Sequence, residues 1–235
     1  MSFDLSEIVP FGRSHAEYLA MFALDGADLA GRILDCGGGP AAFNAELTRA
    51  GGTAVAVDPI YAFDATAIRA RINEVVPDMV AKLEANRDKF RWDRSGSPAE
   101  LVALRQAAMD AFLADYPAGC REGRYVAGAL PELPAAADGF DLALVSHLLF
   151  LYGDHLDRDF HVQALRALTG RAREVRVFPL TDLNARPSPY VAPVRRLLAA
   201  EGMDSEIITV DYESQKGANQ MLRIVAPPVS GTMPT

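Results

Sequence analysis

The chain contains Arg32-Ile33-Leu34-Asp35-Cys36-Gly37-Gly38-Gly39-Pro40-Ala41, an apolar run that passes directly into three glycines. Residues 32–35 predict a strand, and the spacing of Phe43 and Leu47 predicts a helix that ends at the glycines of positions 51 and 52. Glycine lets the backbone of such a turn approach a ligand closely, and the amide groups at a helix start favour a negative or polar group. The segment therefore predicts a strand, a ligand-binding turn and a helix.

A second strand follows this helix. Residues 53–57 form a continuous apolar run, typical of a parallel strand that is covered on both faces, and the run ends at Asp58-Pro59. A carboxylate at this place can accept hydrogen bonds from both hydroxyl groups of a ribose. Asp58 is therefore a candidate nucleoside-binding residue.

An insertion, residues 60–124, separates this unit from the third strand. Helical spacing predicts an amphipathic helix at 65–89, bent or interrupted at Pro77, and a second helix from the capping box at Ser97 to about Tyr116. The two helices could close over a pocket, form a dimer contact or extend the core. The spacing alone leaves these alternatives open.

The alternation of strands and helices continues after the insertion. Two apolar runs, 206–212 and 220–225, flank a polar loop, which predicts a terminal antiparallel hairpin, and residues 226–235 resemble a loose tail. Ser14 and Glu17 have the spacing of a capping box at the start of an N-terminal helix. The other expected elements are that helix at 14–24, strands at 125–128, 140–145 and 174–178, and helices at 157–168 and 188–200.

The composition restricts the class of function. The 235 residues suffice for a single domain (1–235), and the net charge of −8 disfavours a nucleic-acid partner. Cys36 and Cys120 indicate neither a disulfide framework nor a metal site, so a reducing, cytoplasmic compartment is expected and no metal. Residues 1–10 lack the pattern of a secretion signal, and no apolar run reaches the about 20 residues of a membrane span, so no membrane partner is expected.

Four segments resemble motifs of the class I S-adenosylmethionine-dependent methyltransferases. Residues 33–39 resemble the first motif of that family, D/E-x-G-x-G-x-G, and Val57-Asp58-Pro59 resembles its ribose-binding motif. Residues 125–134, followed by 140–144, resemble its third-strand and fourth-strand segments. The resemblance covers most of the chain outside the insertion. It implies an α/β fold with a Rossmann-like, seven-stranded, mostly parallel sheet, an antiparallel terminal hairpin and a helical insertion between the second and third strands.

The resemblance also implies a cofactor, S-adenosyl-L-methionine, and a set of residues that hold it. Asp35 would lie near the methionine amino group, Asp58 on the ribose, Ile60 against adenine and Ser146 beside the methionine end. The chain departs from the family pattern at Ala129, where an aspartate often binds the adenine amino group, so adenine recognition would come from backbone or elsewhere. The remaining candidates for cofactor contact are Gly37, Gly39, Pro59, Ala129 and Leu130.

The candidate catalytic residues follow the fourth strand, at the carboxyl end of the sheet where open α/β folds bind ligands. His147 could accept a proton from the methylated nucleophile, because its ordinary pKa lies near neutrality, or it could fill a polar corner. Tyr152 is the second candidate, with a buried structural role as the alternative. His155 and His161 are expected at the surface.

Three further residues are candidates for substrate contact or for a lid. Arg13 and Tyr18 belong to the N-terminal lid at 10–30, and Asn219 lies in the hairpin loop. A lid excludes water and orders the reactants. Simple packing, and for Asn219 a solvated loop, are the alternatives.

We therefore expect a methyltransferase that acts on a small molecule by in-line methyl transfer, as a monomer or homodimer. Three alternatives remain open. The same fold could cleave or cyclise S-adenosylmethionine, or it could bind the cofactor without catalysis. A nicotinamide-dependent oxidoreductase is the third, because Gly37-x-Gly39-x-x-Ala42 with Asp58 also fits a dinucleotide pattern, although Asp35 and the terminal hairpin argue against it.

Overall fold

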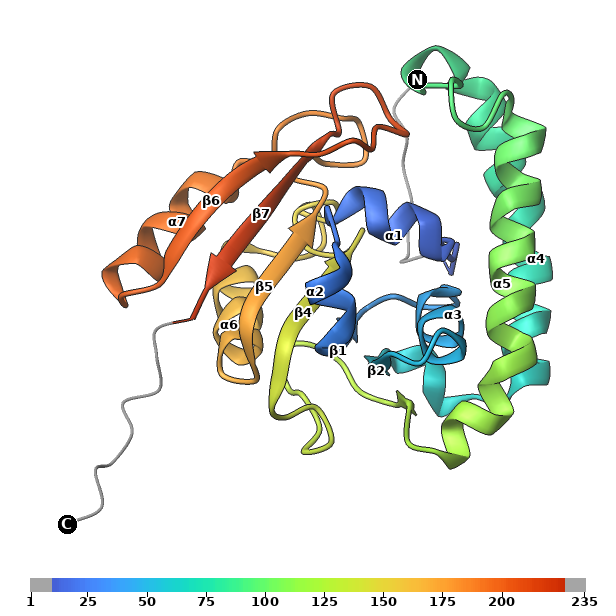
Figure 1. The fold of residues 1–235 in the computed structure, drawn as a ribbon. Coiled ribbons are helices and arrows are strands. Elements are labelled where there is room, and N and C mark those ends of the chain that lie inside the picture. The colour runs from blue at the N-terminus through green and yellow to red at the C-terminus, as the bar shows by residue number, and fades with distance from the viewer. Residues whose placement is uncertain (1–9, 227–235) are drawn as a thin grey trace.

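A computed structural model of the chain describes residues 10–226. The predictions for residues 1–9 and for the tail from 227 onward lie outside this range. Figure 1 shows a sheet with helices on both sides and a long pair of helices along one edge.

The sheet has seven strands in the order β3-β2-β1-β4-β5-β7-β6. Strands β1 to β5 pair in parallel, whereas β7 runs antiparallel to both β5 and β6. This arrangement confirms the predicted fold class, with its mostly parallel sheet and antiparallel terminal hairpin. The strands are β1 (Arg32–Cys36), β2 (Thr53–Val57), β3 (Tyr125–Val126), β4 (Phe140–Ser146), β5 (Ala172–Phe178), β6 (Asp204–Thr209) and β7 (Gln220–Val225).

The sheet is buried on both faces because side chains alternate along its central strands. Leu142 and Leu144 of β4 face a cluster that includes α1 and α3, while Ala143 and Val145 face a cluster that includes α6 and α7. The helices are α1 (His15–Met21), α2 (Gly26–Ala30), α3 (Phe43–Arg49), α4 (Ala65–Ala85), α5 (Pro98–Arg121), α6 (Arg158–Thr169) and α7 (Val191–Ala200), with 3₁₀ turns η1 (Pro59–Ala62) and η2 (Arg87–Lys89). None of the helices within residues 10–226 has the length and apolarity to cross a membrane.

Several predicted boundaries are wrong in detail. Helix α4 continues through Pro77 without interruption and ends at Ala85, and α5 continues through Pro117 as far as Arg121. Burial of Tyr116 and Gly119 against the sheet outweighs the proline at position 117. Strand β3 has only two residues, β6 lies at Asp204–Thr209 rather than 206–212, and the short α2 was not anticipated.

The insertion shares a core with the sheet. Phe112 of α5 is fully buried and packs with Tyr61 of η1 and Tyr125 of β3, whose ring centroids lie 6.0 and 5.3 Å away. Ile68 and Ile72 of α4 join the same cluster. In Figure 1, α4 and α5 run side by side on the side of the sheet where β2 lies, next to the edge strand β3. The packing interpretation of the insertion is therefore correct for this side of the helices.

Because the insertion and the sheet share a core, we expect a substitution in that core to destabilise the whole domain. Phe112→Ala should lower the free energy of unfolding by about 3 to 5 kcal/mol, the usual cost of deleting a buried aromatic ring. Denaturant unfolding followed by circular dichroism measures the change. Leu104→Ala is the control, because Leu104 lies on the same helix but is 49% exposed, and it should cost less than about 1 kcal/mol. A separate early transition of the insertion, with the remaining fold unaffected, would contradict the shared core.

Candidate functional site

A cavity of about 590 Å³ lies at the carboxyl ends of the parallel strands, where α1 and the insertion cover the sheet. This is the edge at which open α/β sheets bind ligands. Of the sequence-predicted site residues, Asp35 and Asn219 are not among those that line it. The others do line it: Arg13, Tyr18, Gly37, Gly39, Asp58, Pro59, Ile60, Ala129, Leu130, Ser146, His147 and Tyr152.

The glycine loop after β1 forms one wall of the cavity. Gly37 and Gly39 have φ angles of +71° and +55°, which L residues with side chains rarely adopt. A Cβ atom on Gly37 would lie 2.5 Å from Cδ2 of Leu148, so the loop also has no room for a side chain there. The loop is fixed at its start because the Gly37 amide donates to the Val57 carbonyl at 2.9 Å.

Asp58, at the end of β2, is tied to this loop. Its Oδ2 accepts a hydrogen bond from the Gly39 amide at 3.0 Å, and its Oδ1 accepts one from the Ile60 amide at 2.9 Å. Each carboxylate oxygen can accept more than one hydrogen bond, so both oxygens can accept a further one from a ligand in the cavity. Burial raises the pKa of Asp58 despite the two amide donors.

Asp35 lies beneath the glycine loop rather than on the cavity surface. It is 2% exposed, and both of its carboxylate oxygens lie 3.2 Å from the hydroxyl group of Tyr18, which donates to them. Burial raises the pKa of Asp35 to about 7, although the Tyr18 hydrogen bond opposes the shift. Two carboxyl groups with raised pKa values, Asp35 and Asp58, thus underlie this end of the cavity, which favours a positively charged ligand.

His147 follows β4 directly and has a φ angle of +54°. Such a conformation is uncommon for a residue other than glycine, although Ala23, Phe150 and Ala185 also adopt it. Burial, together with the charges of Arg13 and Arg105, lowers the pKa of His147 well below its ordinary value. The imidazole is therefore neutral at physiological pH.

His147 shares a hydrogen bond with the residue before it. Its Nδ1 lies 3.0 Å from Oγ of Ser146, and the direction of this bond depends on the tautomer of the imidazole. A serine hydroxyl can both donate and accept. In the tautomer with the proton on Nδ1, the imidazole donates to Ser146 and Nε2 is an acceptor.

A basic cluster forms another part of the cavity wall. Arg105 of α5 is 1% exposed and pairs with Glu17 of α1. The Tyr212 hydroxyl donates to Oε1 of Glu17 at 2.8 Å, and Arg105 Nη2 donates to that hydroxyl at 3.3 Å. Arg13 lines the same cavity. Arg105 was not predicted from the sequence. It lies one helical turn after Leu101, beside the apolar stripe of the predicted helix, and a charged residue at such a position was a signal of an unusual environment.

Tyr152 and Asn219 are the remaining candidate residues, and only Tyr152 lines the cavity. Tyr152 is 4% exposed and packs with Met79 in an apolar cluster at the cavity wall. The hairpin loop reaches the cavity through Gln215 and Ala218, whereas the Asn219 carbonyl accepts a hydrogen bond from the Val210 amide.

The expected surface position of His161 is wrong. The residue is fully buried in α6, and its Nε2 accepts a hydrogen bond from the Phe150 amide at 2.8 Å. This contact fixes the turn after β4 and gives His161 a structural role. His155 is exposed, as predicted.

No protein-family model matches the chain. An uncharacterized protein of Methanocaldococcus jannaschii is 28% identical over 222 residues, which are 94% of this chain and 97% of that protein. Among solved structures, the methyltransferase domain of bacterial CtHen1 aligns with 90% of this chain and 96% of its own, at 14% identity and a TM-score of 0.47. Mitomycin 7-O-methyltransferase MmcR aligns with 91% of this chain and 54% of its own, at 16% identity and a TM-score of 0.48.

The O-methyltransferase NcsB1, solved with S-adenosylmethionine and 2-hydroxy-5-methyl naphthoic acid, is a third similar structure. It aligns with 90% of this chain and 54% of its own, at 15% identity and a TM-score of 0.48.

Asp35 makes the stability of the protein depend on pH. Its pKa is about 7 in the folded protein, against 3.8 for an ordinary aspartate. At a pH where the carboxyl group is protonated in both the folded and the unfolded protein, its ionisation therefore adds no cost to folding. As pH rises from the ordinary pKa through the folded pKa, the wild-type protein loses stability. Asp35→Asn removes this cost and keeps an acceptor for Tyr18. Its gain in free energy of unfolding should grow between pH 4 and pH 8 by up to about 4 kcal/mol.

Denaturant unfolding across this pH range measures the difference between the variant and the wild-type protein. Asp138→Asn is the matched control, since the side chain of Asp138 is 68% exposed, and its difference from wild type should stay constant. An Asp35→Asn curve that runs parallel to the wild-type curve at all pH values would show that Asp35 is an ordinary carboxylate.

Proposed function

We propose that this protein binds S-adenosyl-L-methionine in the cavity and transfers its methyl group to a small molecule. The hydrogen bond between the Gly39 amide and Asp58 carries the proposal, because it joins a side-chain-free loop to a diol-binding carboxylate at the ends of two adjacent strands. The antiparallel β7 and the acidic residue before the glycines support this interpretation over a nicotinamide-dependent oxidoreductase.

The residues of the cavity fit the chemistry of this cofactor. Asp58 has acceptor capacity for both ribose hydroxyls, and Ile60, Ala129 and Leu130 offer apolar surface for the adenine ring. The ammonium group and sulfonium of the cofactor are cationic, which suits an end of the cavity where burial raises the pKa of Asp35 and Asp58. Adenine recognition by backbone and apolar contact fits Ala129, which has no polar side chain.

When bound, S-adenosyl-L-methionine supplies an activated methyl group on a positively charged sulfur. The protein then has to align the acceptor with that group and exclude water. Helix α1 and the insertion cover the cavity and suit the second task. His147 suits the removal of a proton from the acceptor, because its imidazole is neutral and, in the tautomer whose Nδ1–H donates to Ser146, Nε2 can accept the proton. Tyr152 contributes to the apolar wall against which the acceptor would lie.

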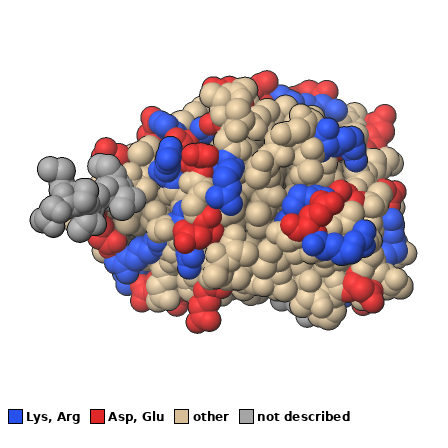
Figure 2. Space-filling model, turned by 60° about the horizontal axis from the view of Figure 1, so that its bottom comes forward, with Lys and Arg blue, Asp and Glu red and all other residues tan. Residues whose placement is uncertain are grey.

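A small molecule suits this site better than a polymer. The cavity is covered by the N-terminal helix and the insertion, which restricts access to a long chain. Figure 2 shows one face of the molecule, on which Lys and Arg alternate with Asp and Glu instead of forming a continuous basic patch. The net charge of −8 also disfavours a nucleic-acid substrate.

Binding of S-adenosylhomocysteine, the demethylated product, tests the cofactor assignment. Isothermal titration calorimetry should give a stoichiometric complex with the wild-type protein. Asp58→Ala should weaken the affinity at least tenfold, because two ribose hydrogen bonds to a charged acceptor are lost, about 2 to 3 kcal/mol. Asp78→Ala removes an exposed carboxylate of α4 and should leave the affinity unchanged. Equal affinity of the Asp58→Ala variant would refute the assignment.

The identity of the product tests the reaction. The protein, incubated with S-adenosyl-L-methionine and a small-molecule extract, should convert the cofactor to S-adenosylhomocysteine, with an extract component gaining the mass of one methylene group. Liquid chromatography with mass spectrometry detects both. Heat-denatured protein is the control. Formation of methylthioadenosine would instead show that the protein cleaves or cyclises the cofactor.

A further inference from the structure

We infer that the methyl acceptor is a carboxylic acid with an apolar body, and that its carboxylate binds to Arg105 and Arg13. The inference depends on the proposed function only in that the same cavity also holds the cofactor. Arg105 belongs to the insertion and Arg13 to the segment before α1, so elements far apart in sequence build this site.

The charges of the basic cluster do not balance. Although burial opposes its ionisation, Arg105 and Arg13 lower the pKa of Glu17 to about 2, so this carboxylate is fully charged. Burial raises the pKa of Tyr212, which therefore stays neutral. Two guanidinium groups face one carboxylate, which leaves one excess positive charge. One carboxylate neutralises that charge, whereas a phosphate dianion would overcompensate it.

The cluster also contains unused donors. The Nε–H group of Arg105 is buried and has no hydrogen-bond partner among the described residues, and the same holds for the Nε–H group of Arg13. Arg105 itself is 1% exposed and lines the cavity. A buried charged donor without an acceptor is costly, and an anionic ligand that drew these guanidinium groups toward the cavity would remove the cost. The guanidinium plane suits the planar carboxylate in particular.

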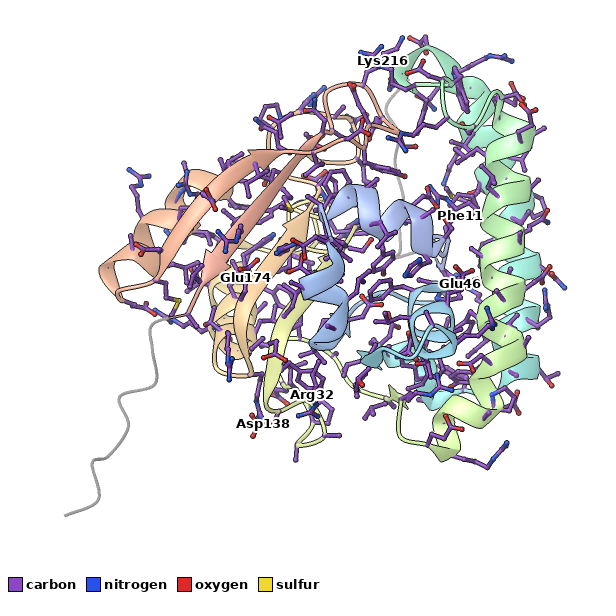
Figure 3. All side chains as sticks on the ribbon, viewed as in Figure 1. Phe11, Arg32, Glu46, Asp138, Glu174 and Lys216 are labelled. Atoms are coloured by element: carbon purple, nitrogen blue, oxygen red, sulfur yellow. The ribbon has the colours of Figure 1, made fainter. Side chains whose placement is uncertain are left out.

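Apolar side chains surround this basic cluster. The guanidinium carbon of Arg105 lies 5.7 Å from the centroid of the Phe11 ring, and Figure 3 shows Phe11 between α1 and α5. Met79, Leu83 and Leu101 line the cavity from the insertion. A free inorganic anion would leave these surfaces uncovered, whereas an acid with an apolar body would cover them.

The anion site lies close to the candidate catalytic residue. Arg13, Arg105 and His147 line the same cavity, and burial together with the two arginine charges lowers the pKa of His147. A bound carboxylate offsets these charges and makes His147 a stronger base. The carboxylate itself carries no proton, so the proton that His147 takes up comes from the separate nucleophilic group of the acceptor that gains the methyl group.

Paired ligands test the inference by calorimetry on the full chain, with and without S-adenosylhomocysteine. The probes are phenylacetate and 4-hydroxycinnamate, each compared with its primary amide, and phenyl phosphate. We expect both acids to bind at least tenfold more tightly than their amides, and phenylacetate more tightly than phenyl phosphate. Equal binding of acids and amides, no binding of either acid, or a preference for phenyl phosphate would overturn the inference.

Two variants link the preference to the site. Arg105→Gln should lower the affinity for both acids at least tenfold, to the level of the amides, and change the affinity for S-adenosylhomocysteine less than twofold. Arg13→Gln keeps the pair between Arg105 and Glu17 and should lower the affinity for the acids severalfold, which tests the site if Arg105→Gln fails to fold. Arg69→Gln removes an exposed charge of the insertion outside the cavity and should change neither affinity.

The two proposals can fail separately. Binding of S-adenosylhomocysteine without discrimination between acid and amide would refute the acidic acceptor alone. Discrimination that depends on Arg105, without binding of S-adenosylhomocysteine, would refute the cofactor and keep the anion site. Acid affinity that is unchanged in both arginine variants would overturn the assignment of the carboxylate to these residues.

Discussion

The site depends on the contact between the Gly39 amide and the Asp58 carboxylate. It links the turn after β1 to the end of β2, two strands that pair in parallel and therefore end at the same edge of the sheet. The contact requires a loop that lacks side chains, because Gly37 and Gly39 both have positive φ angles. Once these two strand ends are joined, the remaining elements only have to enclose the space in front of them.

The cavity wall holds groups of both charges. Burial raises the pKa of Asp35 and Asp58 at the glycine loop, whereas Arg13 and Arg105 supply positive charge from the segment before α1 and from α5. Burial, together with these two arginine charges, keeps His147 neutral. A cationic cofactor and an anionic acceptor would each find a charge that complements them.

The fold was predictable because its signals are local. Continuous apolar runs that end in glycine or aspartate mark the parallel strands, and Asp58 could be assigned from its position at such an end. Arg105 could not be assigned, since helical spacing does not reveal which residue of an apolar stripe faces a cavity. His161 was misplaced for a similar reason, because its bond to the Phe150 amide depends on a turn between β4 and α6. The bend or interruption predicted at Pro77 is wrong, because packing of α4 on α5 maintains the helix through this proline.

A crystal structure of the protein with S-adenosylhomocysteine tests the central claim most directly. The account predicts both ribose hydroxyls within hydrogen-bond distance of the Asp58 carboxylate, with the glycine loop against the homocysteine end and the adenine beside Ile60. A ligand bound away from Asp58 and the glycine loop, or crystals grown in excess ligand that show none in the cavity, would contradict it.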